Sequence, residues 1–238
     1  PDSYNFLAAG FVPDITNFGG INILAILIGV LASIIFIVSQ IIQRQNKKKF
    51  QFEVSSLGTF IARIIVIVCV IVAFTYMLAL YRGIPVVLLI VAGLVIIYAF
   101  VTNKTIVGRQ IYAYGGNPKA AVLSGIKTKK ILFWVYVNMG VLAALAGVIF
   151  TGRLNSATPK SGNGFELDAI GACFIGGAST LGGVGTVVGA IIGGLLMGVL
   201  NNGMSILGVS IDWQMAIKGF VLLAAVSFDV FSKSKSKA

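Results

Sequence analysis

Long hydrophobic runs follow one another along the whole chain and are separated by short polar segments. A run of about 18 or more apolar residues is long enough to cross a bilayer as a helix. We therefore expect an all-α fold, a polytopic transmembrane helical bundle. The pattern predicts about seven spans, with ends set to within a few residues, at 21–42, 60–80, 84–101, 131–151, 166–182, 186–203 and 213–230.

The fifth and sixth predicted spans differ from the others because they are short and rich in glycine. Each of them either crosses the membrane completely or is a broken, re-entrant helix. Composition supports the membrane class as a whole, since 58% of the residues are hydrophobic and only 11% are charged. A soluble domain carries roughly a quarter charged residues.

The formal net charge of +11 comes mostly from residues that lie between the hydrophobic runs. Cytoplasmic loops of membrane proteins are enriched in Lys and Arg, which places 43–60, 102–130 and the basic tail 231–238 in the cytoplasm. These segments contain Arg44, Lys47, Lys48, Lys49, Lys104, Arg109, Lys119, Lys127, Lys129, Lys130, Lys233, Lys235 and Lys237. The segment 1–20 is then extracytoplasmic. The charged residues on the outer side or at its edge are Arg82, Arg153, Lys160, Asp2, Asp14, Glu166 and Asp212. This orientation requires all seven segments to cross.

The residue types present argue against catalytic, metal-binding and nucleotide-binding sites. The chain has no histidine and its seven carboxylates are scattered, so we expect neither catalytic residues nor a metal site. No G-x-x-x-x-G-K-[ST] motif occurs, so this chain is not expected to bind a nucleotide. The positive charge forms no basic face with a stacking module, which argues against nucleic-acid binding.

The segment 102–130 has the strongest local signals. Asn117 is a good N-cap, Pro118 suits the first helical position, and Gly125 suits a left-handed stop after a short helix. Gly115 and Gly116 are expected to let the chain turn sharply before that helix. The small side chains at Ala120 and Ala121 would allow another protein to approach closely, although an ordinary solvated connector is the alternative.

The same segment resembles the coupling loop of the binding-protein-dependent ABC permeases of branched-chain type, in particular the ribose, xylose and multiple-sugar group. That family has approximately G-R-x-x-Y-A-x-G-G-N-x-x-A-A-x-x-S-G-I, and residues 108–126 contain every fixed position. The resemblance implies that a short cytoplasmic coupling helix docks on a separate ATP-hydrolysing subunit. The residues carried over are Gly108, Arg109, Tyr112, Gly115, Gly116, Asn117, Ala120, Ala121, Ser124 and Gly125.

A second stretch, residues 166–186, resembles the same family, which has a similar E-L-x-A-I-A-A-x-x-I-G-G-x-S-x-x-G-G-x-G-T. Glycines at four-residue spacing follow it, and they serve either helix packing or a pore-lining face. These are Gly185, Gly189, Gly193, Gly194 and Gly198.

Polar residues inside predicted spans are costly to bury and therefore informative. Asp168, Asn201 and Asn202 either line a translocation path, since they offer donors and acceptors to sugar hydroxyls, or have structural roles. Asn138 and Gln214 are weaker candidates.

Lys218 lies five residues inside the last predicted span. Its ammonium is expected to snorkel to the outer interface, and the alternative is a place in the pathway.

The resemblance implies a multi-pass permease of the bacterial cytoplasmic (inner) membrane that imports monosaccharides, xylose or multiple sugars. Its expected partners are an ABC ATPase carrying ATP and Mg, an extracytoplasmic sugar-binding protein, a second permease copy and membrane lipid, but no nucleic acid. The core would be 81–230, and 21–80 would be an inserted transmembrane hairpin, with the family's N-terminal helices missing. An ion-coupled secondary transporter of a small neutral solute is the alternative, and a membrane enzyme is disfavoured.

Overall fold

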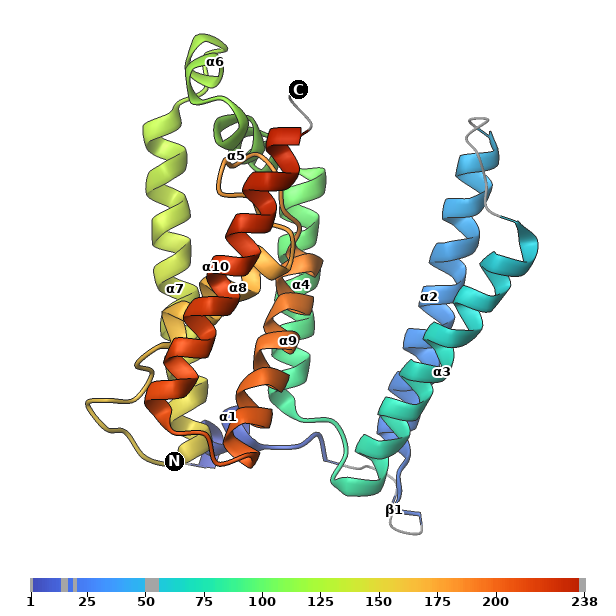
Figure 1. Ribbon diagram of the computed structural model, residues 1–238. Coiled ribbons are helices and arrows are strands. Elements are labelled where there is room, and N and C mark those ends of the chain that lie inside the picture. Colours follow the sequence, from blue (N-terminus) through green and yellow to red (C-terminus); the bar gives the residue numbers. More distant parts are fainter. Residues whose placement is uncertain (1, 14–16, 19–20, 50–55, 236–238) are drawn as a thin grey trace. The chain divides into compact units, whose positions relative to one another are not determined.

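A computed structural model describes residues 2–13, 17–18, 21–49 and 56–235 (Figure 1). The chain forms two compact units, Pro1–Ile90 and Val91–Ala238, which are described separately. Two charged residues used for the orientation, Asp14 and Lys237, lie outside the described residues.

The first unit is built around a helical hairpin. It contains α1 (Asp2–Ala9), the two-residue strands β1 (Asn17–Phe18) and β2 (Ile21–Asn22), α2 (Ile23–Lys49) and α3 (Leu57–Tyr81). The antiparallel strands β1 and β2 precede α2, and the Asn22 side chain accepts a hydrogen bond from the Ala25 backbone N–H at 3.0 Å.

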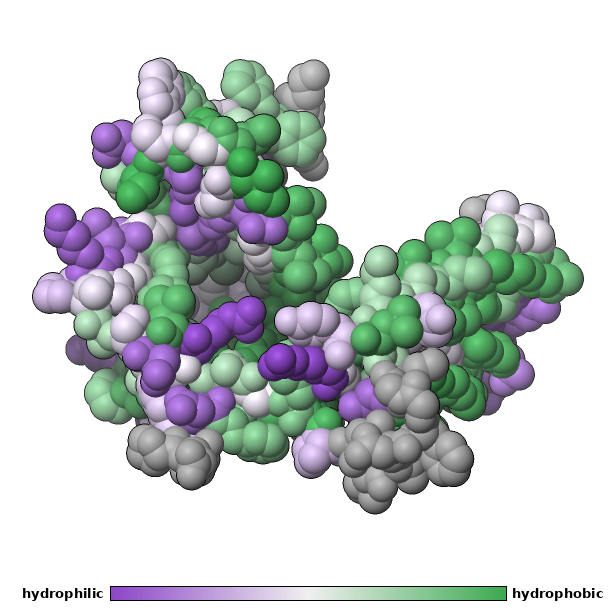
Figure 2. Space-filling view, turned by 90° about the horizontal axis from the view of Figure 1, so that it is seen from below, coloured by the Kyte–Doolittle hydropathy of each residue, from purple (hydrophilic) through white to green (hydrophobic). Residues whose placement is uncertain are grey.

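Small residues bring the two helices of this hairpin together. Gly29 of α2 lies against the Thr75 side chain of α3, where a Cβ atom would clash. Ala25, Ala79 and Ile84 form a small buried core at one end. Outside that core both helices expose large apolar side chains, and Figure 2 shows hydrophobic residues over most of the visible side of the hairpin. This surface suits contact with lipid.

The second unit consists of helices in its described part. α4 (Val86–Lys104) enters from the first unit and is followed by α5 (Ile106–Gly116), α6 (Pro118–Leu123), α7 (Thr128–Leu154), α8 (Phe165–Ile175), α9 (Val187–Ile206) and α10 (Ile211–Lys235). α8 packs against both α9 and α10. The rings of Phe150 and Phe165 meet edge to face at 5.0 Å and join α7 to α8.

Six helices among the described residues are long and apolar enough to cross a membrane. They are α2, α3, α4, α7, α9 and α10, which confirms the expected all-α bundle and six of the predicted spans. The fifth span, expected at 166–182, is instead the 11-residue α8. A helix of this length extends about 16 Å, against about 30 Å of hydrocarbon. For the fifth segment the structure therefore favours a short, broken helix, one of the two alternatives that the sequence leaves open, and six helices among the described residues are long enough to cross.

Glycine geometry explains why α8 stops early. Gly177 has φ +90°, and Gly182 and Gly183 have φ +78° and +73°, in the left-handed region that interrupts a helix. The mean hydropathy of the segment does not reveal this interruption, because the apolar neighbours of the glycines keep that mean high.

The pair α8 and α9 returns to the side from which it enters. The loops before α8 and after α9 lie at the end of the second unit opposite α6 (Figure 1). The side on which α10 ends is therefore the same whether or not α8 crosses. This arrangement is compatible with the predicted sidedness of 102–130 and of the tail, which stays a prediction.

We predict that cysteine labelling will report this orientation. In a background without Cys69 and Cys173, Lys47→Cys and Ala120→Cys should react with a membrane-impermeant maleimide only from the cytoplasmic side. Thr158→Cys, in the loop between α7 and α8, should react only from outside. Labelling of positions 47 and 120 from opposite membrane faces would show that the spans between them are miscounted.

Candidate functional site

The local structure around α6 agrees with the caps that the sequence predicts. The Asn117 side-chain oxygen accepts a hydrogen bond from the Ala120 N–H at 3.0 Å, and Pro118 is the first helical residue. Gly125 has φ +81° just after the helix. A short helix with defined ends thus follows α5 directly, since Asn117 caps both helices.

The exposed face of α6 is more apolar than its small residues suggest. Leu123 and Val122 are 88% and 55% exposed at its end. Ala120 is exposed, whereas Ala121 is only 4% exposed and so cannot contribute its side chain to a docking surface. Among the other residues carried over from the family motif, Gly108 is buried, Tyr112 and Gly115 are partly buried, and the exposed ones are Arg109, Gly116, Asn117, Ser124 and Gly125.

Gly115 and Gly116 do not form the sharp turn that was expected. Both belong to the last turn of α5, and neither has a positive φ. Their backbone instead lies against Gly182 and Gly183, where a Cβ atom on Gly115 would lie 2.7 Å from the Gly183 nitrogen. The two glycines therefore permit a close contact within the chain. Whether they also contact an ATPase stays a prediction.

Residues 176–186, called the glycine loop below, join α8 to α9. The Tyr112 hydroxyl of α5 donates a hydrogen bond to the Gly185 carbonyl at 2.7 Å. On the other side, one Asp229 carboxylate oxygen of α10 accepts from the Ser179 hydroxyl at 3.0 Å and from the Thr180 N–H and hydroxyl at 3.1 Å each. The glycine loop is thereby bonded to both α5 and α10.

Sequence reasoning missed Asp229 as a partner of this loop. Its signal is an acidic residue at the end of the last hydrophobic run, immediately before a basic tail. A carboxylate placed there needs donors, and the Ser-Thr pair of the glycine loop supplies them.

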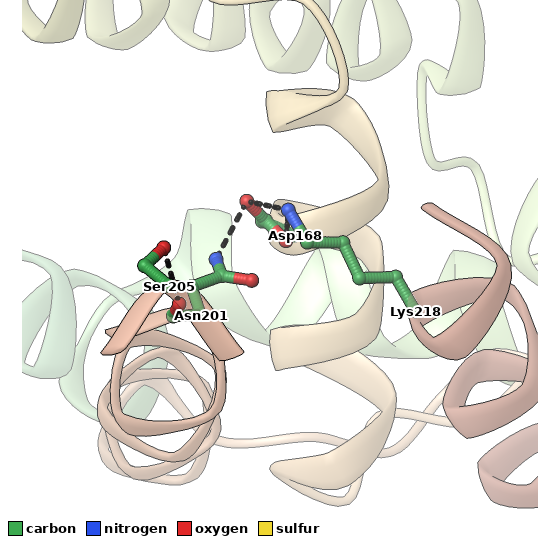
Figure 3. Close-up of polar contacts among 4 residues, drawn as sticks. All are labelled: Asp168, Asn201, Ser205 and Lys218. Carbon is green, nitrogen blue, oxygen red and sulfur yellow. Dashed lines mark hydrogen bonds and ion pairs between the residues drawn. The ribbon is translucent and has the colours of Figure 1, made fainter. Parts of the chain in front are cut away.

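The second candidate site is a polar cluster in which three helices meet (Figure 3). Lys218 of α10 forms an ion pair with Asp168 of α8, with Nζ 2.8 Å from Oδ1 and 3.0 Å from Oδ2. Asn201 of α9 donates to the same carboxylate at 3.0 Å, and the Ser205 hydroxyl donates to the Asn201 carbonyl at 2.9 Å. The side chains of Lys218 and Asp168 are 13% and 21% exposed.

This cluster gives Lys218 a partner that the sequence did not indicate. Its ammonium lies against Asp168 on a neighbouring helix (Figure 3), and its depth in the membrane stays a prediction. Pairing makes the site neutral overall, which lowers the cost of holding two charges away from water.

The other polar residues of the predicted spans differ in exposure and in hydrogen bonding. Asn202 is exposed and does not belong to the cluster, while Asn138 accepts a hydrogen bond from the Tyr98 hydroxyl. The Gln214 side chain donates to the Val209 carbonyl at 2.8 Å. Hydrogen bonds within the chain therefore account for Asn138 and Gln214, whereas a place of Asn202 in the translocation path stays a prediction.

The five glycines at four-residue spacing, Gly185 to Gly198, differ in their surroundings. Gly193 lies against the backbone of Ala172 in α8, and Gly189 against that of Gly176 directly after α8, so tightly that a Cβ atom would clash. Gly194 and Gly198 have open space around them among the described residues, and Gly185 precedes α9. The structure thus shows helix packing at Gly189 and Gly193, and a pore-lining role of Gly194 and Gly198 stays a prediction.

Comparison with known proteins assigns the family. Residues 7–226 match the family described as branched-chain amino acid transport system / permease component. The chain belongs to this permease family. Together with the six long apolar helices, this identifies a multi-pass protein of the inner membrane. No solved structure matches the permease significantly.

Curated relatives of the permease carry sugar names. The chain is 42% identical over 214 residues to the xylose transport system permease protein XylH of Haemophilus influenzae, covering 90% of this chain and 57% of the relative. It is 47% identical over 149 residues to the ribose import permease protein RbsC of Bacillus subtilis, covering 63% and 46%. XylH of Escherichia coli is 37% identical over 210 residues, covering 88% and 53%. The chain spans about half the length of these relatives.

Proposed function

We propose that the chain is a membrane subunit of an ATP-binding-cassette importer and conducts monosaccharides, xylose or several sugars, into the cell. Membership of the permease family and the sugar names of the relatives support this. The observation that carries it is α6, a short, capped helix with an exposed apolar end in the segment that resembles the family's coupling loop. An exposed Leu123 at a helix tip is suited to a pocket on another protein.

The partners follow from this role. A separate subunit would bind ATP and Mg and hydrolyse the nucleotide, because this chain has no phosphate-binding motif. Two copies of the permease would form the path, an extracytoplasmic sugar-binding protein would deliver the solute, and lipid would surround the helices. No cofactor on this chain is part of the proposal.

An ion-coupled transporter is less well supported. Such a protein needs charge in the membrane that a coupling ion can neutralise. Asp168 is already matched by Lys218. The cluster therefore offers a coupling ion no net charge, whereas a neutral polyol requires none.

The polar cluster suggests how a sugar would be contacted. The Asn201 side-chain oxygen is buried and has no hydrogen-bond partner among the described residues. A buried acceptor of this kind costs about 1–3 kcal/mol unless it is satisfied, and a hydroxyl group is a suitable donor. Asn202, the next residue on α9, is exposed. We propose Asp168, Asn201 and Asn202 as part of the translocation path.

We predict that Asn202→Ala lowers the maximal rate of sugar uptake several-fold without changing the preference among sugars, because a permissive polar lining contributes little selectivity. Asn201→Ala should do the same but also remove the bond to Asp168. The measurement is uptake of radiolabelled xylose, glucose and ribose into proteoliposomes containing the ATPase and binding protein. A changed order of preference would show that the permease itself selects the sugar.

The sugar assignment itself is tested with wild-type proteoliposomes. Uptake of at least one pentose or hexose that depends on ATP and on the binding protein is expected. Efficient uptake of a charged solute, with none of any neutral sugar, would exclude the proposed substrate class.

A further inference from the structure

The α5 and α6 helices contact α7, and the end of α5 also contacts the glycine loop. Gly115 and Gly116 end α5, Asn117 follows, and α6 begins at the next residue, so α6 and the contacting glycines are separated by a single residue. The backbone of Gly182 and Gly183 lies against them. A displacement of α6 would therefore act directly on the glycine loop.

We propose that the glycine loop, residues 176–186, is the element inside the permease that receives movement from α5 and α6 and passes it to α8, α9 and α10. The inference rests on the proposed function, since it assigns a role to a coupling movement driven by an ATPase. Tyr112 and Asp229 act in it as positioning residues that hold the two sides of the loop.

Two kinds of contact join the glycine loop to α5, from which it would receive movement. The Tyr112 hydroxyl holds the Gly185 carbonyl at 2.7 Å, which fixes one end of the loop to α5. The glycine contact fixes its middle, because Cβ atoms at Gly115 and Gly183 would lie within 2.7 Å and 2.8 Å of backbone atoms of the other segment. Backbone packed against backbone has no side-chain freedom to absorb a movement.

The transmitting side reaches three helices. Ser179 and Thr180 donate three hydrogen bonds to one oxygen of Asp229, so the loop is bonded to α10. At its ends the loop continues into α8 and α9, whose backbones are packed together at Gly176 and Gly189. These three helices also carry Asp168, Asn201 and Lys218. The loop thus links α5 to the helices that hold the polar cluster.

Adjacent glycines provide a matched test. The Cβ atom of Gly115→Ala would lie 2.7 Å from a backbone nitrogen, whereas that of Gly116→Ala would lie 4.0 Å from the nearest atom, an ordinary contact. Both residues are in the same helical turn. Gly115→Ala should therefore displace the glycine loop, and Gly116→Ala should leave it in place.

We expect Gly115→Ala to lower sugar uptake by about tenfold or more while the ATPase still co-purifies, because the added methyl group overpacks the contact with the glycine loop. Gly140→Ala in α7, where a Cβ atom has nothing within 4 Å, should stay within about twofold of wild-type uptake, and Gly116→Ala is the control for hydrogen exchange alone. Hydrogen exchange, measured on each permease without partners, should be faster in the glycine loop and at Asp229 in Gly115→Ala only. A loss of uptake in Gly140→Ala as large as that in Gly115→Ala, or unchanged exchange in Gly115→Ala, would overturn the inference.

The two proposals fail in different ways. If wild-type permease associates with no ATPase and imports no sugar, the proposed function is wrong. Hydrogen exchange in the isolated permease would then decide about the loop contact by itself. If uptake and association are normal but Tyr112→Phe and Asp229→Ala leave ATP-driven uptake unchanged, singly and together, the transmitting role is wrong and the proposed function stands.

Discussion

Lys218→Met is expected to destabilise the permease strongly, because it leaves the Asp168 carboxylate buried without its counter-ion. Removing one partner of a buried ion pair costs about 3–5 kcal/mol, and the partial exposure here places the expected loss near the lower end of that range. Asp168→Asn should cost less, since an amide can still bond to Asn201. The measurement is the free energy of unfolding in mixed detergent micelles, followed by helical circular dichroism.

The double variant distinguishes a charge effect from a packing effect. Asp168→Asn combined with Lys218→Met removes both charges and should recover most of the loss caused by Lys218→Met alone. Lys160→Met, which changes an exposed lysine in the loop after α7, should have little effect. If Lys218→Met is as stable as Lys160→Met, then Lys218 does not pair with Asp168 in the membrane.

Ala120→Trp is expected to abolish ATPase association and sugar uptake while the permease remains inserted and folded. Ala120 is exposed on α6, so an indole there would hold a docking partner away without disturbing the chain's own packing. Small residues at the centre of an interface permit close approach, and a bulky replacement removes it. Co-purification of the ATPase and uptake into proteoliposomes provide the two measurements.

Matched substitutions locate the effect of Ala120→Trp. Ala157→Trp makes the same change at an exposed position in the loop after α7 and should leave ATPase association intact. Ala121→Trp should unfold the region around α6 instead, because Ala121 is buried. Normal association of Ala120→Trp with the ATPase would contradict the docking role of α6.

Local signals in the sequence predicted local structure well. Asn117, Pro118 and Gly125 each act on backbone groups within four residues, so their type and spacing were enough to place α6 and its ends. The hydrophobic runs likewise predicted the six long apolar helices, because the length of an apolar run is itself a local property.

Features that depend on distant parts of the chain were not predicted. The state of Lys218 is decided by Asp168, 50 residues earlier in the sequence, and the contact of Gly115 is decided by Gly183. Glycine permits both turns and close backbone approach, and only the tertiary structure distinguishes them. The burial of Ala121 beside the exposed Ala120 is equally invisible in composition.

The short α8 has a consequence for how the permease is made. An 11-residue helix extends about 16 Å and cannot be released into the bilayer as an independent span. Its Asp168 also lacks its counter-ion until Lys218 of the last helix has been synthesised. Assembly of this region must therefore wait until α10 has left the ribosome. In a chain that ends before Ile211, α8 would lack its partner α10 and remain exposed to quality-control proteases.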